Sequence, residues 1–272
     1  MIPFAKAHAC GNDFLIVEEK AARNCDRAEM ARRLCARNTG IGADGVEFFK
    51  WTGARAGHKT SYNADGSMAE ISGNGTRCVA AWMAEELKSK PGDELKIETD
   101  SGVRICRVNK LHKIGGFTVD VTTAMGIPHF DLRTVRLADG TEIAGVEVSM
   151  GNPHFVILVN NAEFAVAGRS WQEIGAEICL HTDFPGQTNV EFVRLTRKKA
   201  IEIRIFERGV GPTTSSGTGS SASATAVLAL HGRVSPLAVT APGGEQTVEW
   251  KGPGTELWLT GPAALIAHGE AW

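Results

Sequence analysis

Two short segments combine a serine with closely spaced glycines, and each comes just before a predicted helix. They are Ser72-Gly73-Asn74-Gly75 and Ser216-Gly217-Thr218-Gly219. Glycines let a ligand approach the backbone closely, and a helix N-terminus presents free N–H groups and about half a positive charge. The segments therefore predict two sites for an anionic group such as a carboxylate. The alternative is that each serine serves only as a helix N-cap, with glycines meeting the needs of a turn.

Other polar residues near these segments have side chains suited to a small zwitterion. They are Asn12, Asn63, Asn152, His154, Asn189, Glu207 and Arg208. Asparagine amides both donate and accept hydrogen bonds, whereas Glu207 suits an ammonium group and Arg208 a carboxylate. Taken singly, each asparagine fits a turn equally well, and His154 follows Pro153 at a strand start, where histidines are more often structural. No dinucleotide fingerprint, P-loop or nucleophile elbow occurs in the sequence, which argues against nucleotide binding and serine hydrolysis.

The two serine segments belong to an internal repeat. Gly11-Asn12 recurs as Gly151-Asn152, 140 residues later, and both Val46-Glu47-Phe48 and Ser72-Gly73 recur at an offset of 144 residues. Three matches in the same order, at close to half the chain length, are hard to attribute to chance. We therefore predict two similarly folded halves that bring both helix N-termini to a cleft between them.

The hydrophobic pattern predicts many strands and few helices. Ile201, Ile203 and Ile205 alternate with more polar residues, which indicates a strand. Helices are predicted over Thr76–Lys88, after the capping box that begins at Ser170, and over Gly219–Leu230. The last of these carries small residues on every side. We expect it to run through the middle of its domain with sheet close around it.

Composition narrows the class of protein. The 272 residues are 43% hydrophobic, and 29 basic residues balance 31 acidic ones to a net charge of -2. This balance gives no electrostatic footprint for nucleic acid or an anionic membrane. The sequence lacks an apolar run of about 18 residues, and Cys10-Gly11-Asn12-Asp13 interrupts any signal-peptide core. Six cysteines without a metal-ligand spacing indicate reduced thiols and no metal site. We expect a soluble, cytoplasmic protein.

Several long motifs resemble those of the diaminopimelate epimerase family. They are Cys10-Gly-Asn-Asp-Phe14, Asn63-Ala-Asp-Gly-Ser-Met-Ala-Glu-Ile-Ser-Gly-Asn-Gly-Thr-Arg-Cys78, Gly151-Asn-Pro-His154, Glu207-Arg-Gly-Val-Gly-Pro-Thr-Thr-Ser-Ser-Gly-Thr-Gly219 and Leu259-Thr-Gly-Pro-Ala263. The likeness runs the whole length of the chain. It implies an α/β (α+β) fold of two similar domains related by a pseudo-twofold axis, each a curved, nearly closed sheet around a central helix. The domains would cover residues 1–118 plus 262–272 and residues 119–261.

The resemblance also implies a reaction and a set of site residues. The family interconverts LL- and meso-diaminopimelate without a cofactor, in lysine biosynthesis, and a homodimer is possible. Ser72 and Ser216 would stand at the acid/base positions, with His154 and Glu207 assisting them. The substrate would be bound by side chains of Asn12, Asn63, Asn152, Asn189, Glu207 and Arg208, and by the backbone of Gly73-Asn74 and Gly217-Thr218.

This sequence departs from the family at positions that matter for the reaction. The family normally has cysteine at both acid/base positions, whereas this chain has Ser72 and Ser216. A thiol titrates near pH 8.5, and a gap of roughly 5 pKa units to an alcohol costs on the order of 7 kcal/mol when the base is formed. Related racemases resemble this chain in sometimes carrying a hydroxyl at one such position. Gly45 replaces a substrate-contacting glutamine of some members.

Three hypotheses remain open from the sequence. The first is an epimerase of diaminopimelate or a similar amino acid that uses activated serines. The second is a relative with changed isomerase or dehydratase chemistry, in which Glu207 or His154 transfers the proton. The third is a catalytically silent amino-acid-binding protein, natural or engineered by substitution of serine for cysteine.

Overall fold

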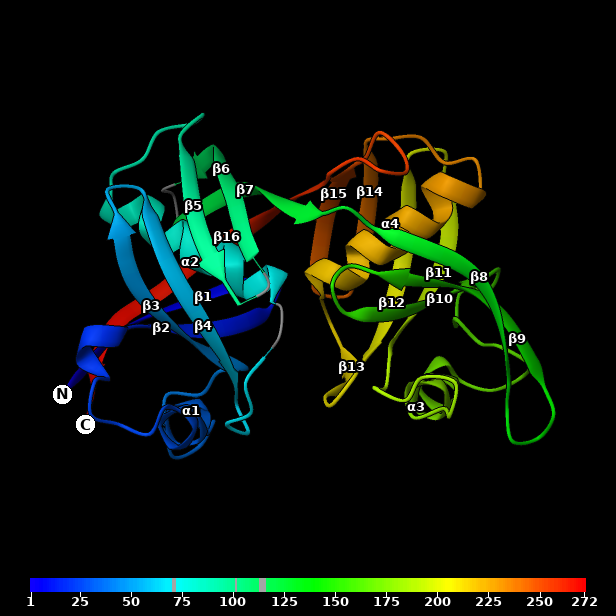
Figure 1. Ribbon diagram of the computed structural model, residues 1–272, viewed down its shortest axis with the longest axis horizontal. Helices are drawn as coiled ribbons and strands as arrows, with labels where there is room; N and C mark the ends of the chain where they lie inside the picture. Colours follow the sequence, from blue (N-terminus) through cyan, green and yellow to red (C-terminus); the bar gives the residue numbers. More distant parts are fainter. Residues whose placement is uncertain (70–71, 101, 113–115) are drawn as a thin grey trace. The chain divides into compact units, whose positions relative to one another are not determined.

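Two units, each a strongly curved β-sheet around a buried helix, make up the chain in the computed structural model (Figure 1). The structure describes residues 1–69, 72–100, 102–112 and 116–272. Unit 1 comprises Met1–Ala124 and Thr260–Trp272, and unit 2 comprises Met125–Leu259. These limits lie six and two residues from the boundaries expected at 118 and 261. Glu70 and Ile71, which belong to the long motif that begins at Asn63, are outside the described residues.

Unit 1 is a closed barrel of eight strands. In barrel order they are β1 (Ile2–Ala9), β2 (Asn12–Glu18), β3 (Gly45–Gly53), β4 (Ala56–Asn63), β5 (Glu94–Thr99), β6 (Gly102–His112), β7 (Phe117–Gly126) and the C-terminal part of β16 (Leu257–Ala271), which pairs with β1. Helix α2 (Gly73–Glu86) fills the barrel, and twelve of its residues are buried. Small side chains on β1, Ala5, Ala7 and Ala9, let this helix lie close to the sheet. The predicted central helix of this half is therefore confirmed.

Unit 2 repeats this plan. Its sheet follows the order of the first residues of β16, β15 (Gly244–Glu249), β14 (Leu237–Ala241), β12 (Ala200–Glu207), β11 (Asn189–Arg197), β10 (Pro153–Val159), β9 (Glu142–Ser149) and β8 (His129–Arg136), with the short β13 (Gly211–Thr213) beside β12. Helix α4 (Gly217–Leu230) is buried from Gly217 to Val227. The Ser221 and Thr225 hydroxyls donate to carbonyls four residues back, so they can lie inside the core.

Strand registers show that the two halves correspond residue by residue. Strands β2 and β3 are parallel with Phe14 beside Gly45, and β10 and β11 are parallel with His154 beside Asn189. These pairs are related by the offsets of 140 and 144 residues seen in the sequence. Antiparallel pairing of β3 with β4 and of β11 with β12 keeps the same correspondence. The predicted internal repeat and fold class are confirmed.

Several elements differ in extent from the sequence prediction. Helices α2 and α4 begin at Gly73 and Gly217, because the glycines belong to their first turns. Helix α3 (Trp171–Cys179) has the expected capping box at Ser170. Helix α1 (Arg27–Cys35), capped by Asp26, was not predicted, although Met30, Ala31, Leu34 and Cys35 form its buried face.

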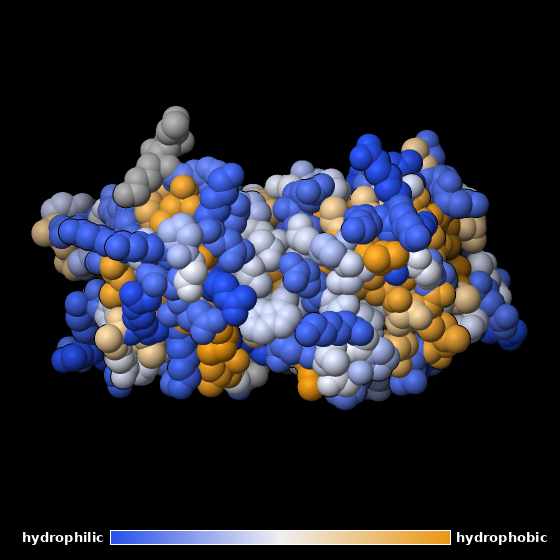
Figure 2. All heavy atoms as spheres, turned by 90° about the horizontal axis from the view of Figure 1, so that it is seen from above, coloured by the Kyte–Doolittle hydropathy of each residue, from blue (hydrophilic) through white to orange (hydrophobic). Residues whose placement is uncertain are grey.

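The outer surface is less apolar than the two cores. The face in Figure 2 is mostly hydrophilic, with smaller apolar patches between the polar residues. The basic side chains of residues 197–199 are exposed where β11 turns into β12. All six cysteines are free. In the described ranges, no helix is both long enough and apolar enough to cross a membrane.

Candidate active site

The N-terminus of α2 carries the first serine segment. Ser72 has extended backbone angles and its Oγ accepts a hydrogen bond of 2.9 Å from Gly75 N, which makes it the N-cap of the helix. Gly73 and Gly75 have helical rather than left-handed backbone, so turn geometry does not require glycine there. At Gly75 the reason is close packing: a β-carbon would lie 1.7 Å from Glu47 Oε1.

A chain of hydrogen bonds joins this helix end to the start of β2. Arg77 donates to Asn74 Oδ1, Asn74 Nδ2 donates to Asn12 Oδ1 (3.1 Å), and Asn12 Nδ2 donates to Asp44 Oδ2 (2.7 Å). Arg77 is fully buried, and burial lowers the pKa of its guanidinium. The chain fixes Asn12 beside the first turn of α2, as expected for two residues of one site.

Basic side chains form ion pairs with Asp44 and with Asp13. Arg37 Nη2 contacts Asp44 Oδ1 at 2.7 Å and Asp13 Oδ1 at 3.0 Å, and Lys6 Nζ lies 3.1 Å from Asp13 Oδ2. Burial raises the pKa of Asp13, but hydrogen bonds from Arg37 and Lys6 outweigh it and hold the pKa below its ordinary value. The Asp13 and Asp44 carboxylates therefore anchor the start of β2, where Asn12 lies.

A buried carboxylate lies beneath the first turn of α2. Glu47, in the middle of β3, is fully buried, and its Oε2 accepts hydrogen bonds from Lys59 Nζ (2.9 Å) and Ser61 Oγ (2.7 Å) on β4. Lys59 also donates to Ser61 Oγ at 2.7 Å. The Lys59 ammonium balances a carboxylate that would otherwise be unpaired in the core.

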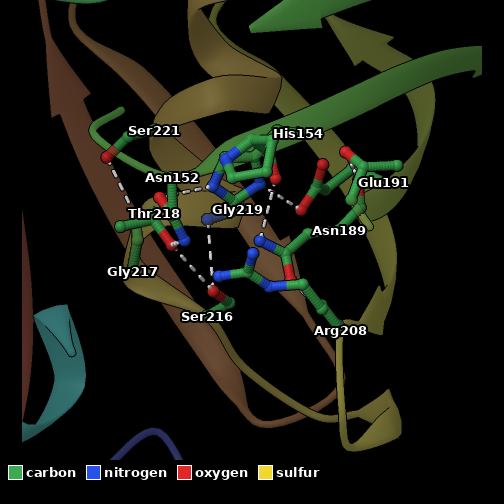
Figure 3. A network of polar contacts seen from close by, with 12 residues as sticks. Asn152, His154, Asn189, Glu191, Arg208, Ser216, Gly217, Thr218, Gly219 and Ser221 are labelled. Carbon is green, nitrogen blue, oxygen red and sulfur yellow. Dashed lines mark hydrogen bonds and ion pairs between the residues drawn. The ribbon is translucent and has the colours of Figure 1, made fainter. Parts of the chain in front are cut away.

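The N-terminus of α4 in unit 2 has the same cap (Figure 3). Ser216 Oγ accepts a hydrogen bond of 3.2 Å from Gly219 N. Asn152 Nδ2 lies 3.4 Å from Thr218 Oγ1, and Asn152 Oδ1 lies 3.0 Å from His154 Nε2. The structure thus places three expected site residues, Asn152, His154 and Thr218, around the capped helix end.

Beneath α4 lies a second buried carboxylate, paired with a histidine. Glu191 Oε1 lies 2.7 Å from His154 Nδ1, and both side chains are fully buried. Both ring nitrogens of His154 therefore have a partner, Glu191 Oε1 at Nδ1 and Asn152 Oδ1 at Nε2. Burial raises the pKa of Glu191, and His154 opposes that rise.

Asn189 and Arg208 lie beside this pair. Asn189 is buried at the start of β11, where its Nδ2 donates to Pro153 O (3.0 Å) and its Oδ1 accepts from Arg208 N (2.9 Å). Arg208 Nη1 donates to Gly186 O at 2.9 Å. Glu207 precedes Arg208 at the end of β12 and is half-buried. Figure 3 draws Arg208 and Asn189 in one network of polar contacts with Ser216.

Asn63 is positioned differently from the other expected site residues. It ends β4, is exposed, and its Nδ2 donates to Ser67 Oγ at 2.9 Å. Its counterpart in unit 2 by the offset of 144 residues is Glu207, which ends β12. Both therefore stand at the same strand end of their own unit.

Some residues around the helix ends were missed by sequence reasoning. They are Asp44, Glu47, Lys59, Ser61, Arg77 and Glu191. A signal was present for two of them, because Glu47 and Glu191 are the acidic centres of the repeated Val-Glu-Phe segments, inside apolar strands. No cluster of three or more histidine, cysteine or acidic side chains suited to a metal occurs within the described ranges.

Comparisons of the sequence with known proteins match one family, diaminopimelate epimerase, over nearly the whole chain. A family model described as diaminopimelate epimerase matches residues 4–128 and 146–266. The diaminopimelate epimerase of Moorella thermoacetica is 34% identical over 282 residues, covering 98% of each chain. Diaminopimelate epimerase 1 of Nostoc sp. is 36% identical over 289 residues, covering 99% of each.

Solved structures of more distant proteins share the fold. A probable proline racemase from Agrobacterium radiobacter K84 superposes with a TM-score of 0.74 at 15% identity, covering 100% of this chain and 93% of its own. A phenazine biosynthesis protein of the PhzF family from Bacillus anthracis gives 0.70 at 15% identity, covering 100% and 99%. At such identities the likeness concerns the fold alone.

Proposed function

Since this chain belongs to the diaminopimelate epimerase family, we propose that it interconverts LL- and meso-diaminopimelate by proton transfer at the α-carbon. The observation that carries the proposal is the pair of equivalent helix ends, each capped by a serine and lined by glycines. No external cofactor is needed in this proposal, because the helix ends supply the electrostatic stabilisation.

Inversion of a stereocentre requires one proton-transferring group on each face of the α-carbon. In the proposal Ser72 takes the proton on one face and Ser216 gives a proton on the other, with the roles reversed in the opposite direction. The carbanion is stabilised by its own carboxylate. Backbone N–H groups of Gly73-Asn74 and Gly217-Thr218 would hold that carboxylate with two preorganised dipoles.

Side chains around the two helix ends would orient the substrate. Asn12 and Asn152 are each held by hydrogen bonds beside a cap, whereas Asn63, Asn189, Glu207 and Arg208 stand at strand ends. Glu207 suits the ammonium group and Arg208 a carboxylate. His154 and Glu207 would assist proton transfer. Gly45 offers no side chain, so recognition of the distal end of diaminopimelate must rely on other residues.

A second candidate is an amino-acid-binding protein without turnover. It is favoured by the observation that both serine hydroxyls already serve as helix caps. An alcohol is also several pKa units less acidic than the thiol usual at these positions. The two candidates differ in whether the α-proton of bound substrate exchanges with solvent.

Incubation with LL-diaminopimelate in D₂O separates them. We expect deuterium at the α-carbon, followed by NMR, together with formation of the meso isomer. Ser72→Ala and Ser216→Ala should each slow epimerisation by roughly 10²–10⁴-fold, the usual contribution of an acid/base group. Tight binding without deuteration would establish the binding protein instead, and a product other than the meso isomer would indicate changed isomerase or dehydratase chemistry.

Assembly and location are proposed on the family relationship. We propose a cytoplasmic enzyme that acts as a homodimer on a free amino acid. Size-exclusion chromatography with light scattering measures the first property, and a monomer at micromolar concentration that retains full activity would contradict it.

A further inference from the structure

The Glu47 carboxylate has one oxygen with two partners and one without. Its Oε2 accepts from Lys59 and Ser61. Its Oε1 is buried and has no hydrogen-bond partner among residues 1–69, 72–100, 102–112 and 116–272. A buried carboxylate oxygen without a donor is costly, so an unpaired oxygen in an otherwise satisfied network points to a group that donates to it at some stage.

Ser72 carries a hydroxyl on the helix end that this oxygen faces. A β-carbon on Gly75 would lie 1.7 Å from Glu47 Oε1 and 2.8 Å from Ser72 Oγ. Adding the two distances gives an upper bound of about 4.5 Å between the two oxygens. Ser72 Oγ accepts a hydrogen bond from Gly75 N, a contact that does not use the hydroxyl proton. Transfer of that proton to Oε1 requires a side-chain rotation of Ser72 that brings the two oxygens within hydrogen-bond distance.

The geometry points to Glu47 as the positioning residue that accepts the Ser72 proton, so that Ser72 acts as a relay between the substrate α-carbon and a buried carboxylate. The inference rests on the proposed epimerase function. It answers the difficulty that serine poses on the Ser72 face, since the group that finally holds the proton there is a carboxylate and Ser72 forms no free alkoxide.

The step balances in protons and electrons. The Cα–H bond breaks and its proton bonds to Ser72 Oγ, while the original Oγ–H bond breaks and that proton bonds to Glu47 Oε1. The electron pair of the Cα–H bond stays on the substrate as the carbanion, and Glu47 becomes a neutral acid. On the opposite face the Ser216 Oγ–H bond breaks, its proton bonds to the α-carbon, and Ser216 Oγ is left as an alkoxide. Ser216 then regains a proton from solvent as Glu47 releases its proton to solvent. In the reverse direction Glu47 returns its proton through Ser72.

Unit 2 also has a buried glutamate oxygen without a hydrogen-bond partner in the described ranges, Glu191 Oε2, but the oxygen that faces the helix differs. There the glutamate oxygen that faces the helix glycine, Glu191 Oε1 at 2.8 Å from a β-carbon on Gly219, is the one hydrogen-bonded to His154. The proposed relay is therefore specific to Ser72 and unit 1.

The test measures Glu47→Gln in two backgrounds, the parent chain and Ser72→Cys. Gln keeps the size of the side chain but cannot take the proton. In the parent background we expect kcat for epimerisation to fall at least about 100-fold with KM changed less than about threefold, and the acidic limb of the kcat profile against pH to disappear. A cysteine forms its own thiolate, so in the Ser72→Cys background the same change should cost less than about threefold.

Each outcome decides the inference. Equal losses in both backgrounds would overturn the relay while leaving the epimerase function standing, because a purely structural role of Glu47 does not depend on the residue at position 72. Absence of α-deuteration by the parent chain would overturn the epimerase function and the relay together. If Glu47→Gln does not fold, the Glu47→Gln/Lys59→Met double variant, which leaves no buried charge, is compared in the same two backgrounds.

Discussion

Both units bury a glutamate beneath a serine-capped helix, yet they neutralise it from opposite sides. In unit 1 Glu47 pairs with Lys59 and Ser61 from β4. In unit 2 Glu191 pairs with His154 from β10. Where one unit has the polar partner of its glutamate, the other unit has an apolar residue at the equivalent position.

The strand registers make this exchange explicit. By the repeat offset of 144, Lys59 and Ser61 correspond to the apolar Ile203 and Ile205, and by the offset of 140 His154 corresponds to Phe14. The two halves thus share one backbone fold, but a different residue, on a different neighbouring strand, contacts the buried glutamate in each. In unit 1 an ammonium group and a hydroxyl donate to the buried acid, whereas in unit 2 a histidine ring contacts it.

Removal of the lysine should give the largest loss of stability. Lys59→Met leaves Glu47 as a buried charge without its cationic partner, which we expect to cost about 3–5 kcal/mol of unfolding free energy. Equilibrium urea denaturation measures it. The Glu47→Leu/Lys59→Met double variant should recover most of that loss.

The matched change in unit 2 sharpens the contrast. His154→Phe introduces the residue that unit 1 has at the equivalent position, and we expect a smaller cost of about 1–3 kcal/mol. Glu191, whose pKa is raised by burial, can take up a proton when its partner is lost. Equal costs for Lys59→Met and His154→Phe would show that the two pairs respond alike.

Substitution of the helix glycine should also destabilise unit 1 more than unit 2. In Gly75→Ala the new β-carbon meets Glu47 Oε1 at 1.7 Å, whereas in Gly219→Ala it meets Glu191 Oε1 at 2.8 Å. Overpacking of a core typically costs 1–3 kcal/mol, and alanine regains up to about 1 kcal/mol in helix propensity. We expect about 2 kcal/mol of destabilisation for Gly75→Ala and less than about 1 kcal/mol for Gly219→Ala. Thermal unfolding of both variants checks the order, which a larger cost at Gly219 would reverse.

The smallest effect is a pH dependence of stability in unit 2. A carboxyl group whose pKa is raised on folding contributes stability below its unfolded pKa and loses that contribution as pH rises through the folded pKa. Burial raises the pKa of Glu191. The parent chain should therefore lose stability relative to Glu191→Gln as the pH rises above about 4.5. Urea titrations from pH 4 to 8 measure the difference, and a constant difference would show that His154 cancels the shift.

Much of the fold was readable along the chain because its determinants are local. Ser72 and Ser216 cap helices, Ser170 opens a capping box, and alternating isoleucines mark β12; each of these signals involves neighbours within a few residues. The repeat added long-range information, since two copies of one pattern must satisfy the same packing. Helix α1 was missed even though Asp26 caps it, because its nine residues carry only a short apolar face.

By itself, the sequence determined the fold class, the repeat, the family and the serines at both helix caps. Only the tertiary structure decided which groups lie around those serines. Asp44 meets Asn12 across 32 residues, Lys59 meets Glu47 across adjacent strands, and His154 meets Glu191 through parallel pairing of β10 with β11. A buried carboxylate needs a hydrogen-bonding partner. Strand register and side-chain length decide which residue that is, and both depend on segments that are far apart in the sequence.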